Sequence, residues 1–307
     1  MTPRISTRVL VSTAVGLITG LCCFLLLLKI GSAAGDFTWA YNAANDLLNG
    51  RDPYRHEVRR FWTPYPLPTA LVAVPFTVFS PEIAGATFFG LSSALMIYGF
   101  SQKGFLPLLV LLSYPFYANL QWAQWSPLIV ASAFLPALMF VSVIKPNVAG
   151  PVVLLHWRVI GIITSAILLI FSLIIYPTWP IKWLSQLSHY EGYVPLLTIP
   201  GPLLLLALTR WRERDAQFLL LASIFPQRWF YDALILWLIP KTRKEFLYSV
   251  TFSWGAYVWR LYHMPESSLE RGLVVTLFFY LPMLFIILTR KREGSQKLEE
   301  VTSGAAQ

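Results

Sequence analysis

The chain has 307 residues, of which 56% are hydrophobic and only 13% are charged, whereas an ordinary soluble domain carries about 25% charged residues. The formal net charge of +9 does not indicate nucleic-acid binding, because the basic residues cluster between long apolar runs, as the positive-inside rule and anionic lipid headgroups would produce. The composition therefore predicts an all-α polytopic membrane protein and leaves no room for a separate soluble domain. Residues 1–292 are predicted to form one transmembrane domain, and residues 293–307 a disordered cytoplasmic tail.

The first apolar run extends from Val9 to about Leu28. Its length of about 20 residues exceeds the core of about 7–15 residues in a secretory signal peptide. We therefore expect a retained first helix, with a cleaved signal ending near Ser32-Ala33-Ala34 as the alternative. In either case the basic residues Arg4 and Arg8 predict a cytoplasmic N-terminus and an external loop over residues 31–68. The adjacent cysteines Cys22 and Cys23 cannot join distant segments and say little about redox compartment.

Several further runs are long enough, or nearly long enough, to cross a bilayer, which requires about 20 residues in a helix. Together with the first run they are 9–29, 84–100, 105–121, 125–143, 159–178, 193–209, 246–262 and 272–289. Shorter apolar pieces lie near 69–79, 148–155, 216–225 and 231–240. Such pieces normally line a cavity or lie at the interface. We therefore predict a bundle of about 8–10 spans with broken or re-entrant helices.

Basic clusters orient this bundle. Those predicted to be cytoplasmic are Lys103, Arg158, Arg210–Arg214, Lys241–Lys244 and Arg290–Arg292. The segment Ala216–Pro240 then begins and ends inside, so we expect a broken hairpin whose tip, Phe225–Asp232, points to the outer half of the membrane. The orientation of residues 144–158 stays open.

The external loop begins with a predicted short amphipathic helix, because Phe37, Tyr41, Ala44 and Leu48 follow helical spacing. Asn49-Gly50 ends this helix. Asp36 precedes it and is, on spacing alone, a candidate N-cap. Further along the loop, Asp52 before Pro53 is typical of a turn, and Tyr41, Tyr54 and Tyr65 are typical of aromatic residues at a membrane interface.

The loop and several later blocks resemble glycosyltransferase family 87, the polyprenyl-phosphate-mannose-dependent mannosyltransferases of the GT-C superfamily. The matching residues are Gly35-Asp36-Phe37, Tyr41, Ala43-Ala44, Leu47-Leu48, Gly50, Asp52-Pro53-Tyr54, Tyr65-Pro66-Leu67-Pro68, Pro75, Gln124, Lys145-Pro146 and Tyr231-Asp232. The chain is a short and divergent member by this resemblance: Ala123 stands where the family has Gly, and Leu67 where it has the second Pro.

The resemblance implies a GT-C-like bundle that transfers mannose, with inversion, from a polyprenyl-phosphate donor to a hydroxyl of a glycolipid, glycan or protein acceptor at the outer face of a cell membrane. Asp36 is then the catalytic base that accepts the hydroxyl proton. Positive side chains would stabilise the departing phosphate, and the candidates are Arg228, Lys145, Lys182 and His189. The remaining predicted substrate-binding residues are Tyr41, Asp52, Tyr54, Tyr65, Gln124, Tyr231 and Asp232.

No cofactor is expected. The four histidines have no ligand spacing, so a metal site is not predicted, and the absence of a Gly-rich phosphate loop disfavours a nucleotide-sugar donor. Two other functions stay open, a lipid-linked substrate transporter or flippase and a non-catalytic membrane subunit. So do plainer roles for three residues: Asp36 as a cap without a cavity, Lys145 at a cytoplasmic helix end, and Asp232 paired with Arg228. A cavity that touches Asp36 and either Arg228 or Lys145 would favour the enzyme.

Overall fold

The computed structural model describes residues 3–55, 65–263 and 267–291. Apart from one isolated antiparallel bridge between Tyr193 and Gln227, the described backbone is helical or irregular. The α-helices are α1 (Ile5–Ile30), α2 (Thr38–Leu48), α3 (Pro68–Ala73), α4 (Pro81–Phe100), α5 (Tyr114–Gln121), α6 (Ser126–Ser132), α7 (Pro146–His156), α8 (Val159–Ile175), α9 (Trp179–Gln186), α10 (Arg214–Ile224), α11 (Arg243–Tyr262), α12 (Ser268–Val275) and α13 (Leu281–Thr289). The longer 3₁₀ segments are η4 (Leu106–Leu112), η5 (Pro136–Val143), η8 (Gly201–Arg210) and η9 (Phe230–Leu238). The predicted tail 293–307 lies outside the described residues.

Three of the described helical stretches are long and apolar enough to cross a membrane: Ile5–Ile30, Pro81–Lys103 and Ser268–Thr289. A fourth is added if α8 and α9, which meet at a bend of 99°, are counted as one span. The chain is thus helical with several apolar helices suited to a bilayer, and this part of the prediction is confirmed. The larger number of about 8–10 spans is not confirmed.

Two of the predicted spans are apolar runs that prolines interrupt. Residues 105–121 divide at Ser113, directly before Tyr114-Pro115, into η4 and α5. Residues 125–143 divide into α6 and η5, where Pro136 opens the second piece. Proline removes a backbone donor and clashes with the preceding turn, so it begins a helix more readily than it continues one. Hydropathy registers the apolar run but not this break.

Helices α1 and α4 pack closely because small residues line their contact. A Cβ added at Gly16 would lie 2.7 Å from the Cβ of Ala94, and one at Gly90 would lie 2.7 Å from the carbonyl oxygen of Gly16. Small residues that admit close backbone approach are typical of membrane helix pairs. On its other face α1 exposes large apolar side chains such as Leu17 and Leu21, which suits contact with lipid.

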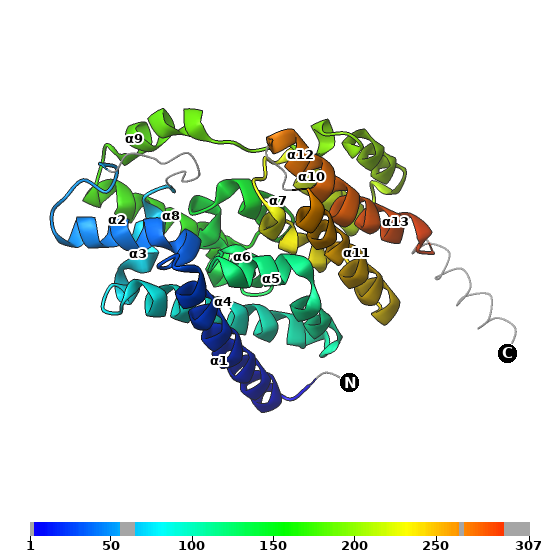
Figure 1. Ribbon diagram of the computed structural model, residues 1–307, viewed down its shortest axis with the longest axis horizontal. Coiled ribbons are helices and arrows are strands. Elements are labelled where there is room, and N and C mark those ends of the chain that lie inside the picture. The colour runs from blue at the N-terminus through cyan, green and yellow to red at the C-terminus, as the bar shows by residue number, and fades with distance from the viewer. Residues whose placement is uncertain (1–2, 56–64, 264–266, 292–307) are drawn as a thin grey trace, which may run out of the picture.

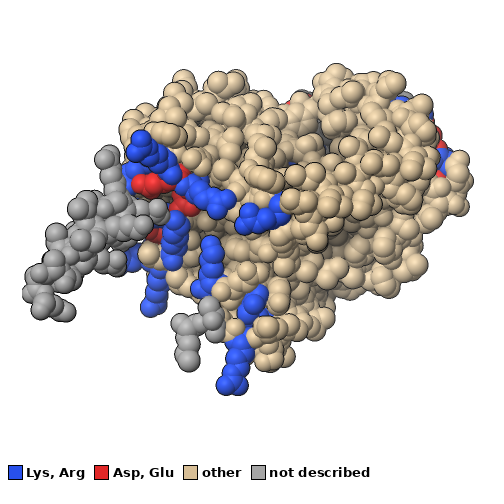
Figure 2. Space-filling view, turned by 180° about the vertical axis from the view of Figure 1, so that it is seen from behind, with Lys and Arg blue, Asp and Glu red and all other residues tan. Residues whose placement is uncertain are grey.

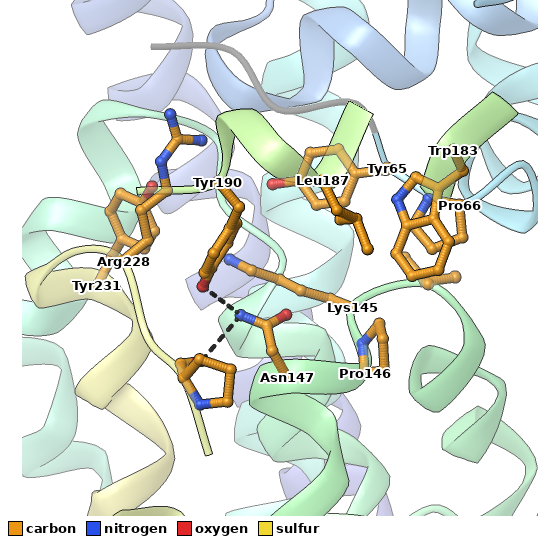
Figure 3. A pocket seen from close by; sticks show the side chains of 12 residues that line it. Tyr65, Pro66, Lys145, Pro146, Asn147, Trp183, Leu187, Tyr190, Arg228 and Tyr231 are labelled. Carbon is orange, nitrogen blue, oxygen red and sulfur yellow. Dashed lines mark hydrogen bonds between the residues drawn. The ribbon is translucent and has the colours of Figure 1, made fainter. Parts of the chain in front are cut away.

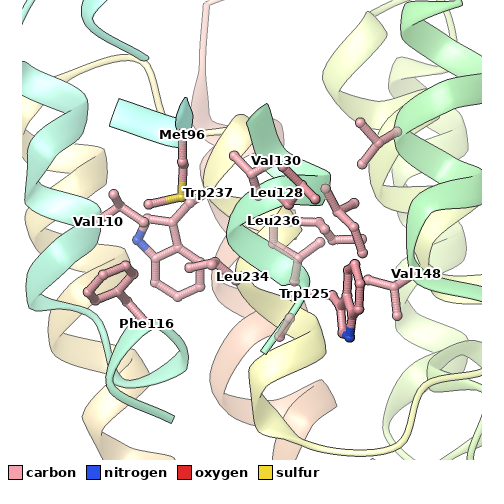
Figure 4. Packing of buried hydrophobic residues seen from close by; sticks show 14 of the residues in the cluster. Met96, Val110, Phe116, Trp125, Leu128, Val130, Val148, Leu234, Leu236 and Trp237 are labelled. Atoms are coloured by element: carbon pink, nitrogen blue, oxygen red, sulfur yellow. The ribbon is translucent and has the colours of Figure 1, made fainter. Parts of the chain in front are cut away.

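Segment η9 runs through the core. Its side chains Leu234, Leu236 and Trp237 are buried, and Figure 4 shows them packed among Met96, Val110 and neighbouring residues. The predicted broken hairpin is present as α10, an irregular tip from Phe225 to Trp229, and η9. The hairpin therefore places Arg228 and Asp232 at the junction between its tip and the core.

The two ends of the molecule differ in charge. Arg8 donates to the carbonyl of Tyr98 near the end of α4 at 3.0 Å, and Arg290 pairs with Asp215 and Glu245. One cavity is lined by Lys103 from the end of α4 and by Asp215, so these basic clusters, distant in sequence, meet on one side. Figure 2 shows Lys and Arg side chains gathered over the left and lower-left part of a face whose remaining surface is largely uncharged. Helix α1 has 26 residues and rises about 39 Å from this basic end toward α2, and α9 lies along the opposite edge (Figure 1).

Candidate functional site

Asp36 lies in a short turn, Gly35–Phe37, that joins the end of α1 to α2. Its backbone N–H donates to the carbonyl oxygen of Trp122 at 2.8 Å. The preceding Gly35 has a φ of +61°, and a Cβ there would lie 2.5 Å from the same carbonyl oxygen. Glycine is therefore required for this close approach, which holds Asp36 against the loop between α5 and α6.

The Asp36 carboxylate does not cap α2. No side chain accepts a capping hydrogen bond at the start of that helix, so the N-cap hypothesis is wrong. Instead, Oδ2 accepts hydrogen bonds from the hydroxyl of Tyr231 at 3.2 Å, from the hydroxyl of Tyr65 at 3.5 Å and from the side-chain amide of Gln124. No described residue donates to Oδ1. One oxygen is therefore held in place while the other is left for a ligand.

A buried polar chain extends from Asp36 into the core. Gln124 donates its amide to Asp36, and its Oε1 accepts from Lys145 Nζ at 3.4 Å. Because an ammonium only donates and a carboxylate only accepts, this arrangement sets the orientation of the Gln124 amide. Lys145 Nζ also lies 2.8 Å from Asp232 Oδ1, and Asp232 Oδ2 accepts from the backbone N–H of Arg228 at 3.0 Å. Lys145 and Asp232 thus form a buried ion pair.

These contacts correct two hypotheses from the sequence, that Lys145 lies at a cytoplasmic helix end and that Asp232 pairs with Arg228. Lys145 is only 7% exposed and directly precedes α7 inside the bundle, so it is not a solvated helix end. Asp232 forms its ion pair with Lys145, and its contact with Arg228 is made through the backbone.

Two cavities meet at Arg228 and Tyr231. The larger, of about 490 Å³, is lined by Asp36, Trp122, Trp229, Phe230 and Arg260 together with both shared residues. The smaller, of about 280 Å³, is lined by Tyr65, Lys145, Asn147, Trp183 and Tyr190 and again by both. Figure 3 shows Lys145 reaching across this smaller cavity, with Arg228 and Tyr231 at one end and Trp183 and Pro66 at the other. A carboxylate and a guanidinium therefore border one hollow, and a buried ammonium borders the next.

Of the predicted site residues, the structure brings together Asp36, Tyr65, Gln124, Lys145, Arg228, Tyr231 and Asp232. Tyr41 is not among them: its hydroxyl donates to the carbonyl of Phe79 at 2.8 Å. Tyr54 contacts the site indirectly: its hydroxyl donates to the backbone carbonyl of Tyr65 at 3.0 Å and so helps to position that residue. Burial, and then the nearby negative charges of Asp36 and Asp232, raise the pKa of Tyr65 well above its ordinary value, so its hydroxyl stays protonated as a donor.

Asp52 has a separate role. One carboxylate oxygen accepts from the backbone N–H of Tyr54 at 2.9 Å, which forms the turn predicted there, and the other pairs with Lys182 of α9. Burial raises the pKa of Asp52, but the hydrogen bonds from Lys182 and Tyr54 outweigh it and leave the pKa below its ordinary value. Lys182 therefore ties α9 to the first loop, and it does not line either cavity.

Sequence reasoning overlooked several residues of the site. Asn147 donates to the hydroxyl of Tyr190 at 3.1 Å and to the carbonyl of Pro226 at 3.1 Å (Figure 3), which joins the start of α7 to the hairpin tip. Arg260 of α11 lines the larger cavity. Asn147 follows Lys145-Pro146 directly, which was a local signal, whereas Arg260 sits in an ordinary helical pattern and offered none. The side chain of His189 lies outside what the structure describes.

Within residues 3–55, 65–263 and 267–291, no group of three or more His, Cys, Asp or Glu side chains is placed to hold a metal ion. The site is thus a carboxylate, a buried ion pair and an arginine around two adjacent cavities that share Arg228 and Tyr231. Several apolar helices carry it and indicate a membrane protein. No protein-family model, no curated protein and no solved structure matches this chain.

Proposed function

We propose that this chain is a membrane glycosyltransferase of the GT-C type. It would move a sugar, mannose by the resemblance to family 87, from a polyprenyl-phosphate donor to a hydroxyl acceptor at the outer face of a cell membrane. The observation that carries the proposal is the position of Asp36, whose carboxylate lines a cavity of about 490 Å³ together with Arg228.

The carboxylate is suited to act as a general base. Three donors hold Oδ2, and no described residue donates to Oδ1. An acceptor hydroxyl in the cavity can then give its proton to Oδ1 while its oxygen attacks the sugar carbon from the face opposite the phosphate. The bond between that carbon and the phosphate oxygen breaks, and the phosphate leaves with the electron pair. The configuration at the sugar carbon is inverted.

The departing phosphate gains negative charge, which a preorganised cation stabilises. Arg228 borders both cavities, so a donor in the smaller cavity and an acceptor in the larger one would meet at its side chain. A guanidinium can bind a phosphate with two parallel hydrogen bonds. Lys145 is the second cation at this junction, although its pairing with Asp232 assigns it mainly to holding Gln124 and the hairpin in place.

The test uses the purified full chain in lipid nanodiscs with radiolabelled polyprenyl-phosphate-mannose and a membrane extract as the source of acceptors. The wild type is expected to release polyprenyl phosphate and label an acceptor. Asp36→Asn keeps the shape of the side chain but removes its basicity, so we expect transfer to fall by about 100-fold or more. Glu82→Gln, which makes the same chemical change at the start of α4, serves as the control and should retain activity.

Two results would reject the proposal. One is transfer by Asp36→Asn at the wild-type rate, and the other is a wild type that leaves the donor intact. If the intact labelled donor instead crosses the bilayer of a vesicle, the transporter hypothesis takes its place. If the donor is neither cleaved nor moved across the bilayer, the hypothesis of a non-catalytic subunit replaces the proposal.

A further inference from the structure

A third cavity, of about 650 Å³, lies at the basic end of the molecule, away from Asp36. It is formed where the end of α4, the end of α7, the start of α10 and the end of η9 meet. The charged residues that line it are Lys103, Arg158, Arg212, Glu213, Arg214, Asp215 and Lys241. None of these belongs to the site described above.

The acidic residues of this cavity are already paired. Asp215 Oδ2 lies 2.7 Å from Lys241 Nζ, and Glu213 Oε1 lies 2.9 Å from Nη1 of Arg210. Four lining cations have no carboxylate partner in the part of the chain that the structure describes. They are Lys103, Arg158, Arg212 and Arg214. The cavity thus carries an uncompensated positive charge.

These four cations come from separate segments and line one cavity together with the partly buried His156. Burial lowers the pKa of His156, and the positive charges of three of them, Arg214, Lys103 and Arg158, add to that lowering. His156 Nδ1 is 3.0 Å from the carbonyl oxygen of Val152, which fixes the orientation of the ring.

Most of the uncharged residues that line the cavity are apolar. Phe134, Leu155 and Phe218 border the same cavity, and Lys103 Nζ lies 5.8 Å from the ring centroid of Phe134. A positively charged rim beside apolar walls matches an amphiphile with an anionic head and a hydrocarbon part. A free small anion would leave those walls in contact with water.

We propose that this cavity binds the phosphate of an anionic lipid headgroup, with the acyl chains along its apolar wall. Arginine side chains bind phosphate oxygens through charge-assisted, bidentate hydrogen bonds, and basic pockets between membrane helices are suited to such headgroups. This inference is independent of the proposed glycosyltransferase activity, because the two sites lie at opposite ends of the bundle and use different residues.

The experiment is native mass spectrometry of the purified full chain in detergent with added phosphatidylglycerol or, separately, phosphatidylcholine. Phosphatidylglycerol should be retained in preference. The double variant Arg158→Gln, Arg214→Gln should bind it at least about tenfold more weakly, since hydrogen bonds to charged groups are lost. The matched control is Arg243→Gln, Lys244→Gln, which removes the same charge from exposed positions at the start of α11 that do not line the cavity.

Arg214 also donates to the carbonyl of Leu155, so its variant loses a hydrogen bond of the fold as well as a charge. Lys103→Gln, Arg212→Gln gives a second test without that bond, and it should weaken binding as the first pair does. Equal losses in the cavity and control variants would mean a general surface attraction and overturn the proposal, as would absence of phosphatidylglycerol preference. In a further arm, glycerol phosphate that binds while phosphatidylglycerol does not would overturn the assignment to a lipid.

Discussion

Two carboxylates serve the site, and their partners differ in kind. Asp36 accepts hydrogen bonds from two hydroxyls and an amide, and it forms no ion pair with a residue that the structure describes. Asp232 is buried against the ammonium of Lys145. The first arrangement leaves a charged oxygen available to a ligand, whereas the second satisfies a charge inside the core. We therefore assign chemistry to Asp36 and positioning to the Lys145–Asp232 pair.

Removal of one partner from that buried pair should be costly. Lys145→Met would leave Asp232 unpaired in the core and is expected to lower the free energy of unfolding by about 3–5 kcal/mol. Lys145→Met combined with Asp232→Leu should recover part of this loss, because no buried charge remains. Chemical unfolding in detergent measures both. Lys182→Met, which breaks the partly exposed pair with Asp52, is the control. A loss in Lys145→Met no larger than in this control would contradict the positioning role.

Arg228 can be tested by a change that keeps its charge. Arg228→Lys retains a cation at the junction of the two cavities but removes the planar, bidentate donor. We expect the KM for the lipid-phosphate donor to rise by about tenfold or more, while the unfolding midpoint stays close to that of the wild type. Steady-state kinetics with the labelled donor measure the change, and Arg55→Lys in the first loop is the control. An unchanged KM would shift the phosphate partner to another cation, with Arg260 the first to examine.

At the scale of elements, α9 closes over the smaller cavity and is held there by the first loop. Trp183 of α9 lines that cavity, Lys182 pairs with Asp52, and Gln186 donates to the carbonyl of Tyr54 at 3.3 Å. The hydrophobic run predicted over residues 159–178 ends at a bend of 99° between α8 and α9. The bend lays α9 across the site.

The tie between α9 and the loop should depend on pH. The pKa of Asp52 is lowered from 3.8 in the folded chain, since the hydrogen bonds from Lys182 and Tyr54 outweigh the burial that raises it. The pKa of Lys182 is raised above 10.5, first by its hydrogen bond to Asp52. A carboxyl whose pKa is lower in the folded chain stabilises the fold at pH values above its unfolded-state pKa, and this stabilisation is lost as pH falls through its folded-state pKa. A lysine whose pKa is higher in the folded chain stabilises the fold below its unfolded-state pKa, and this stabilisation is lost as pH rises through its folded-state pKa. The pair is thus complete from pH 3.8 to 10.5.

Hydrogen-exchange protection factors for the amides of α9 measure this. In the wild type we expect protection in the neutral range that declines below pH 3.8. In Asp52→Asn, protection should already be reduced in the neutral range and should show no further decline due to protonation at position 52. Protection in α9 that is the same in the variant and the wild type at neutral pH would show that other contacts hold the helix.

At the scale of the whole molecule, the site and the basic surface lie at opposite ends. Basic clusters from the N-terminus, the end of α4, the start of α10 and the end of α13 meet on one side, whereas Asp36 follows the far end of α1. Positive residues are retained on the cytoplasmic side of a membrane. The charge distribution therefore predicts that Asp36 faces outward.

Cysteine labelling tests this orientation in a Cys22→Ser, Cys23→Ala background. Asn42→Cys lies on an exposed position of α2, and Arg243→Cys on an exposed position at the basic end. A membrane-impermeant maleimide added to intact cells should label only the first, and both should react once the cells are opened. Labelling of position 243 alone in intact cells would invert the topology and remove the basis for an outer-face reaction.

The sequence by itself predicted what depends on neighbouring residues. It predicted the short helix that ends at Asn49-Gly50, the turn at Asp52, the hairpin around Phe225–Asp232 and the apolar helices, because spacing, turn residues and hydropathy act along the chain. The predicted number of about 8–10 spans is not confirmed, since breaks such as those at Ser113 and Pro136 depend on what surrounds an interrupted helix.

Only the tertiary structure decided how the polar residues pair. Asp36 meets Gln124 across 88 residues and Tyr231 across 195, and Lys145 meets Asp232 across 87. On spacing alone Asp36 was a plausible cap and Arg228 a plausible partner for Asp232. A side chain takes the nearest partner in space, and for a buried charge that partner is chosen by how the bundle packs, because an unpaired charge in the core is too costly to retain.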